Sequence, residues 1–336
     1  MTTLATQVEA AKAAGRGLAA LSGEARSALL RGFAAALSDP ARRAPVAAAN
    51  AEDLAAGRAA AARGELAPAL VDRLGLDEKK IAALVDGLSQ LAARPELVNR
   101  VLERRELDRG LLLERVSAPL GVVAVVFESR PDALVQIAGL AWKSGNAVAL
   151  KGGREARRTN RALAALAQEV LAAHGVDPRA VLLLEERAEV AALLELAGKV
   201  DLVVARGSSG FVRHVRATSR IPVMAHADGI CHLVLGAAAE PAMAARIAVD
   251  AKTSYPAACN SIETLLWEPA AAAALDASVA ALAAAGVELR ACPATRERHP
   301  SLAAATDADW DTEHGAPVLS IRQVADLDAA LAHVAA

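Results

Sequence analysis

The 336-residue chain has few aromatic residues and a net charge of only −2. Phe, Trp and Tyr make up 2% of it, whereas alanine dominates the 54% of hydrophobic residues. Alanine favours helices, which indicates an α/β protein and disfavours an all-β one. Because 37 basic residues nearly balance 39 acidic ones, no global field favours nucleic acid or an anionic membrane. An anionic substrate would need a local cationic pocket.

Several common signals are also absent. Cys231, Cys259 and Cys292 are too far apart for a metal cluster or a disulfide framework. Residues 1–9 lack the basic and apolar regions of a signal peptide, and charges interrupt each alanine-rich run before it reaches membrane-spanning length. Neither standard phosphate loop, G-x-G-x-x-G nor G-x-x-x-x-G-K-[ST], occurs. We expect a cytoplasmic enzyme or binding protein, long enough for two domains.

The first 104 residues predict successive helices. Ser22 and Asp77 precede helical patterns and are typical N-cap residues, and another helix is expected over 46–63. Residues 106–116 then predict a β-hairpin that turns at Gly110. Pairing with a second subunit would cover its exposed edges, and an ordinary surface hairpin is the alternative.

From residue 119 onward, strand and helix patterns alternate. Strands are expected over 121–127, 146–150, 180–184, 201–205 and 231–235. Helices are expected over 131–143, 156–173 and 187–197, with one more opening at 207–210. Such alternation predicts an α/β fold with a parallel sheet covered by helices. Ligands bind such sheets beyond the carboxyl ends of the strands, here residues 128–131, 151–155 and 207–210.

Two of these strand ends have residues suited to a dinucleotide. Residues 207–210 (Gly-Ser-Ser-Gly) open a helix whose N-terminus could hold a pyrophosphate, although a plain serine-capped helix start is the alternative. Lys151 and Arg154 flank two glycines and could bind ribose or phosphate oxygens. A lone basic pair in a loop would usually be solvent-exposed charges.

Cys259 lies where a helical segment, broken by Pro256, meets an apolar, β-compatible run. A side chain at such a junction can meet a ligand while rigid neighbours hold it, which suggests a catalytic nucleophile. The alternative is a buried cysteine that acts as a small hydrophobic residue.

Together these stretches resemble a known superfamily. Residues 119–123, Lys151 and residues 257–259 resemble the strand start, cofactor turn and nucleophile loop of the aldehyde dehydrogenases. Within that superfamily, residues 127–131, 151–156, 226–232 and 258–266 resemble the γ-glutamyl phosphate reductase family. The resemblance implies a Rossmann-type cofactor domain, an α/β catalytic domain, and NADPH-dependent reduction of L-glutamyl 5-phosphate through a thioester on Cys259. An oxidoreductase for another acyl phosphate or aldehyde, or a non-catalytic nucleotide-binding remnant, are the alternatives.

The same resemblance assigns the remaining site residues. Ser129 would help to hold the developing oxyanion, and Arg130 and Asn260 would contact the substrate, with a structural ion pair as the alternative for Arg130. The residues that would bind NADP are Lys151, Gly153, Arg154, Gly207, Ser208 and Glu313. No metal is expected.

Two positions depart from the oxidising aldehyde dehydrogenases. Those enzymes carry a glutamate that activates water for thioester hydrolysis, whereas the matching position here is His226. The absence of this glutamate fits reduction of an acyl phosphate, which needs no hydrolytic water. Arg154 stands where relatives that prefer NAD often carry a glutamate, so we expect it to accommodate the 2′-phosphate of NADP.

The resemblance also sets the expected domains and partners. Residues 1–104 and 118–235 would bind NADP, residues 105–117 would be an oligomerisation hairpin, and residues 236–336 would be the catalytic domain. Residues 324–334 resemble the opening of the family's C-terminal signature, so we expect the chain to be truncated within it and the catalytic domain to be incomplete. The expected partners are a second copy of the chain and glutamate 5-kinase.

Overall fold

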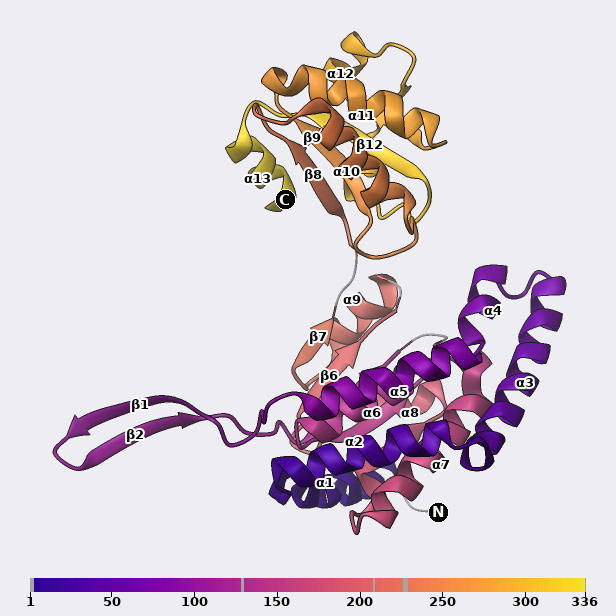
Figure 1. The fold of residues 1–336 in the computed structure, drawn as a ribbon, viewed down its shortest axis with the longest axis vertical. Helices are drawn as coiled ribbons and strands as arrows, with labels where there is room; N and C mark the ends of the chain where they lie inside the picture. The colour runs from indigo at the N-terminus through magenta and orange to yellow at the C-terminus, as the bar shows by residue number, and fades with distance from the viewer. Residues whose placement is uncertain (1–2, 128–129, 208, 226–228, 336) are drawn as a thin grey trace. The chain divides into compact units, whose positions relative to one another are not determined.

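The computed structural model describes residues 3–127, 130–207, 209–225 and 229–335. The chain divides into two compact units, Met1–Ala227 and Asp228–Ala336. Each unit contains a parallel five-stranded sheet and its own hydrophobic core (Figure 1). The α/β fold predicted from the alternating pattern is therefore confirmed.

Unit 1 begins with five helices, as expected. They are α1 (Leu4–Ala20), α2 (Gly23–Ser38), α3 (Pro40–Ala62), α4 (Pro68–Leu74) and α5 (Glu78–Ala93). The predicted N-caps are confirmed, because Ser22 accepts a hydrogen bond from the Ala25 N–H and Asp77 accepts one from the Lys80 N–H. The predicted start of α3 at residue 46 was too late. Asp39 caps this helix instead, and Pro45 lies inside it.

A hairpin of β1 (Val101–Asp108) and β2 (Leu111–Val116) follows and extends away from the rest of unit 1 (Figure 1). Gly110 has a φ of +75°, the left-handed conformation expected of this turn. The hairpin begins at residue 101, a few residues before the boundary we expected. Its large apolar side chains are about half exposed or more, including Leu102 (52%), Leu107 (60%) and Leu112 (57%).

The sheet of unit 1 has the strand order β5-β4-β3-β6-β7. Its strands are β3 (Val122–Val126), β4 (Ala147–Lys151), β5 (Val181–Leu184), β6 (Leu202–Ala205) and β7 (Val223–Ala225). Its helices are α6 (Pro131–Lys143), η1 (Arg154–Ala156), α7 (Arg157–Ala173), η2 (Pro178–Ala180), α8 (Arg187–Leu194) and α9 (Ser209–Thr218). The predicted strands of this sheet are confirmed to within about two residues, and β7 was missed.

The order of the strands determines where the helices lie. From β3 the chain moves outward to β4 and β5, and then crosses back to β6 on the other side of β3. Right-handed crossovers therefore place α6 and α7 on one face of the sheet and α8 and α9 on the other. Helices α2 and α5 pack on α6, and α1 packs against β3, β4 and α8.

Unit 2 contains the strands in the order β11-β10-β12-β9-β8, all parallel. Its strands are β8 (Cys231–Leu235), β9 (Ile262–Trp267), β10 (Glu288–Ala291), β11 (Ala303–Ala304) and β12 (Val318–Gln323). Its helices are α10 (Pro241–Thr253), η3 (Pro269–Ala271), α11 (Ala272–Ala284), α12 (Pro293–Arg298), η4 (Asp307–Asp311) and α13 (Leu327–Ala335). We expected β8 in the first domain, with the boundary after residue 235. That placement is wrong, because β8 pairs with β9 of the second sheet.

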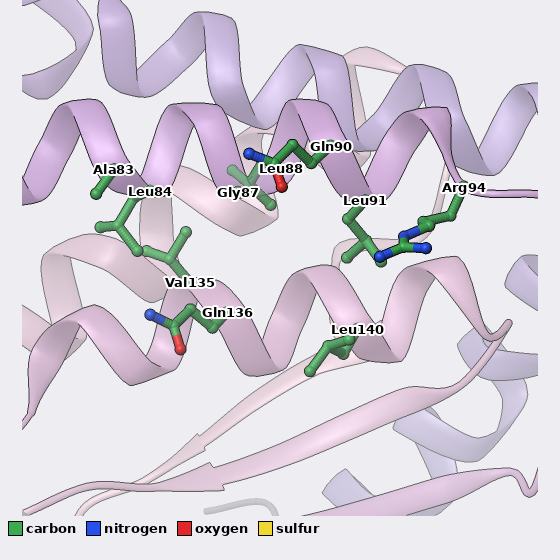
Figure 2. A pocket seen from close by; sticks show the side chains of 10 residues that line it. All are labelled: Ala83, Leu84, Gly87, Leu88, Gln90, Leu91, Arg94, Val135, Gln136 and Leu140. Atoms are coloured by element: carbon green, nitrogen blue, oxygen red, sulfur yellow. The ribbon is translucent and has the colours of Figure 1, made fainter. Parts of the chain in front are cut away.

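A groove of about 310 Å³ lies between α5 and α6 of unit 1 (Figure 2). Leu84 and Leu91 of α5 and Val135 and Leu140 of α6 line it, with Arg94 at one end. None of the predicted site residues that the structure describes lines this groove.

Candidate functional site

The carboxyl end of β4 carries the lysine predicted to bind the cofactor. Lys151 is 9% exposed, and its Nζ donates a hydrogen bond to the Gly152 carbonyl oxygen at 2.6 Å. Burial lowers the pKa of Lys151, and Arg187 lowers it further, while Glu155 and two other carboxylates act in the opposite direction. A buried amine at a strand end, near cations and carboxylates, is suited to binding hydroxyl or phosphate oxygens of a ligand.

The turn after Lys151 approaches α7 closely. A Cβ on Gly152 would lie 2.2 Å from Asn160 Nδ2 and 3.0 Å from the Phe127 ring, so a larger residue would displace the Asn160 amide. A small cavity lies between Gly152, Gly153, Arg154 and Asn160, and the Asn160 Oδ1 is buried without a hydrogen-bond partner. An unsatisfied oxygen at this turn, next to Arg154, offers one polar contact to a ligand. Arg154 itself is exposed at the start of η1.

The other predicted cofactor turn lies at the end of β6. A Cβ on Gly207 would lie 2.9 Å from the Phe211 ring, so the turn packs tightly against the first residues of α9. The predicted helix opening is confirmed, because α9 begins at Ser209. Ser208 falls outside the described residues, and its assigned role stays a prediction.

The end of β3 leads to the residues predicted to contact substrate. Arg130 Nη2 lies 2.9 Å from Asp132 Oδ2, and the arginine side chain is 59% exposed while the carboxylate is largely buried. The ion pair that we gave as the alternative for Arg130 is thus present, with the guanidinium still accessible to solvent. Ser129 falls outside the described residues.

In unit 2, Cys259 lies on the turn between α10 and β9. Its side chain is exposed, which excludes the alternative of a buried hydrophobic cysteine. Backbone hydrogen bonds stabilise the turn on both sides of Cys259. The Ala258 N–H donates to the Tyr255 carbonyl at 2.9 Å, and the Ser261 N–H donates to the Ala258 carbonyl at 2.9 Å. Asn260, the next residue, is also exposed. An accessible sulfur on a hydrogen-bonded turn is the arrangement expected of a nucleophile.

Two residues near position 230 approach the backbone of Cys259, and Glu313 contacts one of them. The Cys231 Sγ donates to the Cys259 carbonyl oxygen at 3.4 Å. Gly229 lies so close that a Cβ on it would be 2.5 Å from the same oxygen. The Gly229 N–H in turn donates to Glu313 Oε2 at 2.9 Å. The predicted nucleophile and the glutamate predicted to bind NADP therefore lie in one neighbourhood within unit 2.

We did not predict a role for Cys231 from the sequence. Burial raises its pKa, and the charges of Cys259, Glu263 and Glu313 raise it further, so this thiol stays protonated where it contacts the nucleophile loop. The available signal was its place at the start of a strand, shortly after the His226 position in the same motif. His226 itself falls outside the described residues.

Two further findings concern the described residues. Among them, no group of three or more His, Cys, Asp or Glu is arranged to hold a metal ion. No described helix is both long and apolar enough to cross a membrane.

The chain matches no family model. It is, however, 48% identical over 333 residues to the γ-glutamyl phosphate reductase of Synechococcus sp. (strain JA-2-3B'a(2-13)), covering 98% of this chain and 73% of that protein. It is also 50% identical over 310 residues to the enzyme of the same name from Parasynechococcus marenigrum, covering 92% of this chain and 70% of that protein. The chain belongs to the γ-glutamyl phosphate reductase family.

Solved structures of the family agree with this assignment. The γ-glutamyl phosphate reductase of Thermotoga maritima superposes with a TM-score of 0.93 at 29% identity, over 99% of this chain and 80% of that one. The Saccharomyces cerevisiae member gives 0.61 at 34% identity, over 99% and 84%. A propionaldehyde dehydrogenase from Rhodopseudomonas palustris gives 0.62 at 16% identity, so the fold is that of the aldehyde dehydrogenase superfamily.

Proposed function

We propose that the chain reduces L-glutamyl 5-phosphate to L-glutamate 5-semialdehyde with NADPH and releases phosphate, the second step of proline synthesis from glutamate. The observation that carries this proposal is the exposed Cys259 thiol on a hydrogen-bonded turn, in a chain 48% identical to a relative named for this activity. The proposed location is the cytoplasm.

Cys259 acts as the carrier of the acyl group. Its thiolate attacks the acyl carbon, the S–C bond forms, and the C–O bond to phosphate breaks with its electron pair on the departing phosphate. The bound reduced nicotinamide would supply the hydride that converts the thioester to the aldehyde. The C–S bond then breaks and regenerates the thiolate. Ser129 is proposed to donate to the carbonyl oxygen during both steps, together with the Cys259 backbone N–H.

The proposed NADP-binding residues of unit 1 lie at two strand ends. Lys151, Gly153 and Arg154 would hold the adenosine ribose and its 2′-phosphate, and Gly207 with Ser208 would hold the pyrophosphate. The buried Lys151 and the unsatisfied Asn160 Oδ1 support a polar ligand at the first of these ends. In unit 2, Glu313 would bind the nicotinamide ribose.

The substrate would be oriented by Arg130 and Asn260. Arg130 pairs with the Asp132 carboxylate, so substrate oxygens would add to an existing ion pair whose cationic side chain is 59% exposed. The His226 position, where water-activating enzymes carry a glutamate, supports an outcome in which hydride and not water resolves the thioester.

The assembly proposed for the chain is a homo-oligomer. The β1–β2 hairpin pairs only with itself among the described strands and carries exposed leucines, which favours pairing with a second copy. An association with glutamate 5-kinase would pass the unstable acyl phosphate between the two sites. In this proposal unit 1 is the cofactor domain and unit 2 the catalytic domain.

The reverse reaction tests the proposed chemistry. With L-glutamate 5-semialdehyde and phosphate, the intact chain should reduce NADP, and Cys259→Ala should lower the rate about a thousandfold or more. Cys292→Ala is the matched control, because this cysteine is buried in the same unit. Undiminished turnover in Cys259→Ala would show that another group carries the acyl intermediate. NADPH binding without turnover in the intact chain would instead indicate a nucleotide-binding protein.

A further inference from the structure

A fully buried ion pair connects the two ends of the Cys259 turn. Lys252 lies in the last turn of α10 and Glu263 is the second residue of β9. Their Nζ and Oε2 atoms are 2.7 Å apart, and both side chains are 0% exposed. The nucleophile lies in the stretch between them.

Stability alone does not account for such a pair. Removing a charge from water costs on the order of several kcal/mol per ion. Buried pairs can often be replaced by apolar residues without loss of stability. The pair also lies next to the nucleophile turn, because Glu263 follows Ile262, the residue of β9 that pairs with Cys231, and the Cys231 thiol contacts the Cys259 carbonyl. A charged, hydrogen-bonded pair can fix the position of a neighbouring backbone segment, which apolar side chains cannot do.

The second carboxylate oxygen of Glu263 contacts the segment that follows Glu313. Glu263 Oε1 accepts a hydrogen bond from the Gly315 N–H at 3.3 Å. Gly315 has a φ of +58°, so its segment turns sharply just after Glu313. Glu313 then accepts from Gly229, which lies against the Cys259 carbonyl. The contacts form a closed ring that begins and ends at the nucleophile turn.

We propose that Glu263, held in place by Lys252, is a positioning residue that fixes the 313–315 segment relative to the Cys259 turn. Because both side chains are fully buried, the pair acts through the backbone of this segment and orients the Glu313 carboxylate without itself touching substrate or cofactor. The inference rests on the proposed function for the use it gives to Glu313, whereas the contacts themselves do not depend on that function.

Two double variants separate positioning from simple stability. Lys252→Met with Glu263→Gln removes both charges and keeps an oxygen that can accept from Gly315. Lys252→Met with Glu263→Leu removes the charges and the acceptor together. Thr295→Val is the matched control, because it deletes another buried hydrogen bond of unit 2, the one from Trp267 Nε1 at 2.8 Å.

The first measurement is amide hydrogen exchange at Gly315 and Gly229, which needs no turnover. We expect both amides to be protected in the intact chain and in the glutamine variant, and to exchange about tenfold faster in the leucine variant. Thr295→Val should lower the melting temperature and leave both amides protected. Fast exchange at Gly315 in the intact chain, or equal protection in the two double variants, would overturn the inference.

The second measurement is NADPH affinity by fluorescence, with KM and kcat where turnover is present. The leucine variant should bind NADPH about tenfold more weakly, and the glutamine variant should bind like the intact chain. If the intact chain shows no turnover but the exchange pattern holds, the proposed function fails and the positioning role stands. Equal NADPH affinity in both double variants would contradict the role assigned to Glu263.

Discussion

The three cysteines differ at the scale of single residues in what surrounds each sulfur atom. Cys292 is buried and its sulfur lies 3.3 Å from Thr295 Oγ1. The Cys231 thiol is partly buried and donates to the backbone of the nucleophile turn. Cys259 alone among the three is exposed. Local context, and not residue type, selects the one that can meet a substrate.

Gly229 is predicted to be required by the close approach to Cys259. In Gly229→Ala the added Cβ would lie 2.5 Å from the Cys259 carbonyl oxygen, so the turn must shift. We expect kcat to fall by roughly tenfold to a hundredfold, with a loss of about 1–3 kcal/mol in the free energy of unfolding. Gly17→Ala in α1, where a Cβ meets nothing within 4 Å, should leave kcat unchanged. Normal kcat in Gly229→Ala would show that the turn tolerates displacement.

Arg154 is predicted to set the preference for NADP. Arg154→Glu replaces the cation proposed to meet the 2′-phosphate by an anion that repels it, so KM for NADPH should rise about tenfold or more. KM for NADH should change little, because that cofactor lacks the phosphate. Arg16→Glu on the exposed face of α1 makes the same change of charge elsewhere. Equal effects of Arg154→Glu on the two cofactors would remove Arg154 from the proposed 2′-phosphate site.

At the scale of elements, two kinds of local signal predicted the structure well. Continuous apolar runs marked the buried strands β3 and β4, and side-chain caps marked the starts of α2 and α5. Strand β7 was missed because it has three residues and its Met224 is 63% exposed. The start of α3 was missed because Pro45 suggests a helix boundary, whereas Asp39 and Pro40 begin the helix more than a turn earlier.

The β1–β2 hairpin is predicted to drive self-association. Leu107→Glu with Leu112→Glu places charges on an apolar surface that a second copy would cover, so the variant should elute with the mass of one chain. The intact chain should show a larger mass by light scattering. Met243→Glu changes an accessible apolar residue on α10 and should not alter assembly. A monomeric intact chain, or an unchanged variant, would contradict this prediction.

At the scale of the whole chain, the site depends on contacts that local patterns do not contain. Gly229 and Glu313 are 84 positions apart, and their hydrogen bond follows from the way β8, β9 and β12 lie side by side in one sheet. The resemblance to a known family identified Glu313, but it assigned no role to Lys252 or Glu263. We misplaced the domain boundary for the same reason, because the pairing of β8 with β9 depends on tertiary structure and not on the local pattern.

Unit 2 is predicted to lose stability in acid, because it holds two histidines with lowered pKa values. Burial lowers the pKa of His232, against a hydrogen bond with the Ile230 backbone that raises it. Burial also lowers the pKa of His333, as do Arg322 and His232, while Asp311 raises it. The rings lie 5.2 Å apart, and both Nε2 atoms are buried without a hydrogen-bond partner.

The sign of the effect follows from proton binding. An unfolded histidine has a pKa of about 6.5, so below that pH the unfolded chain binds protons that folded unit 2 does not. The contribution of both rings to stability is therefore present above a pH of about 6.5 and is lost as the pH falls toward their folded-state pKa values. We expect the melting temperature of unit 2 to be lower at about pH 5.5 than at about pH 7.5, and His232→Phe with His333→Phe to reduce that difference. An unchanged pH dependence in the double variant would assign the acid sensitivity to other groups.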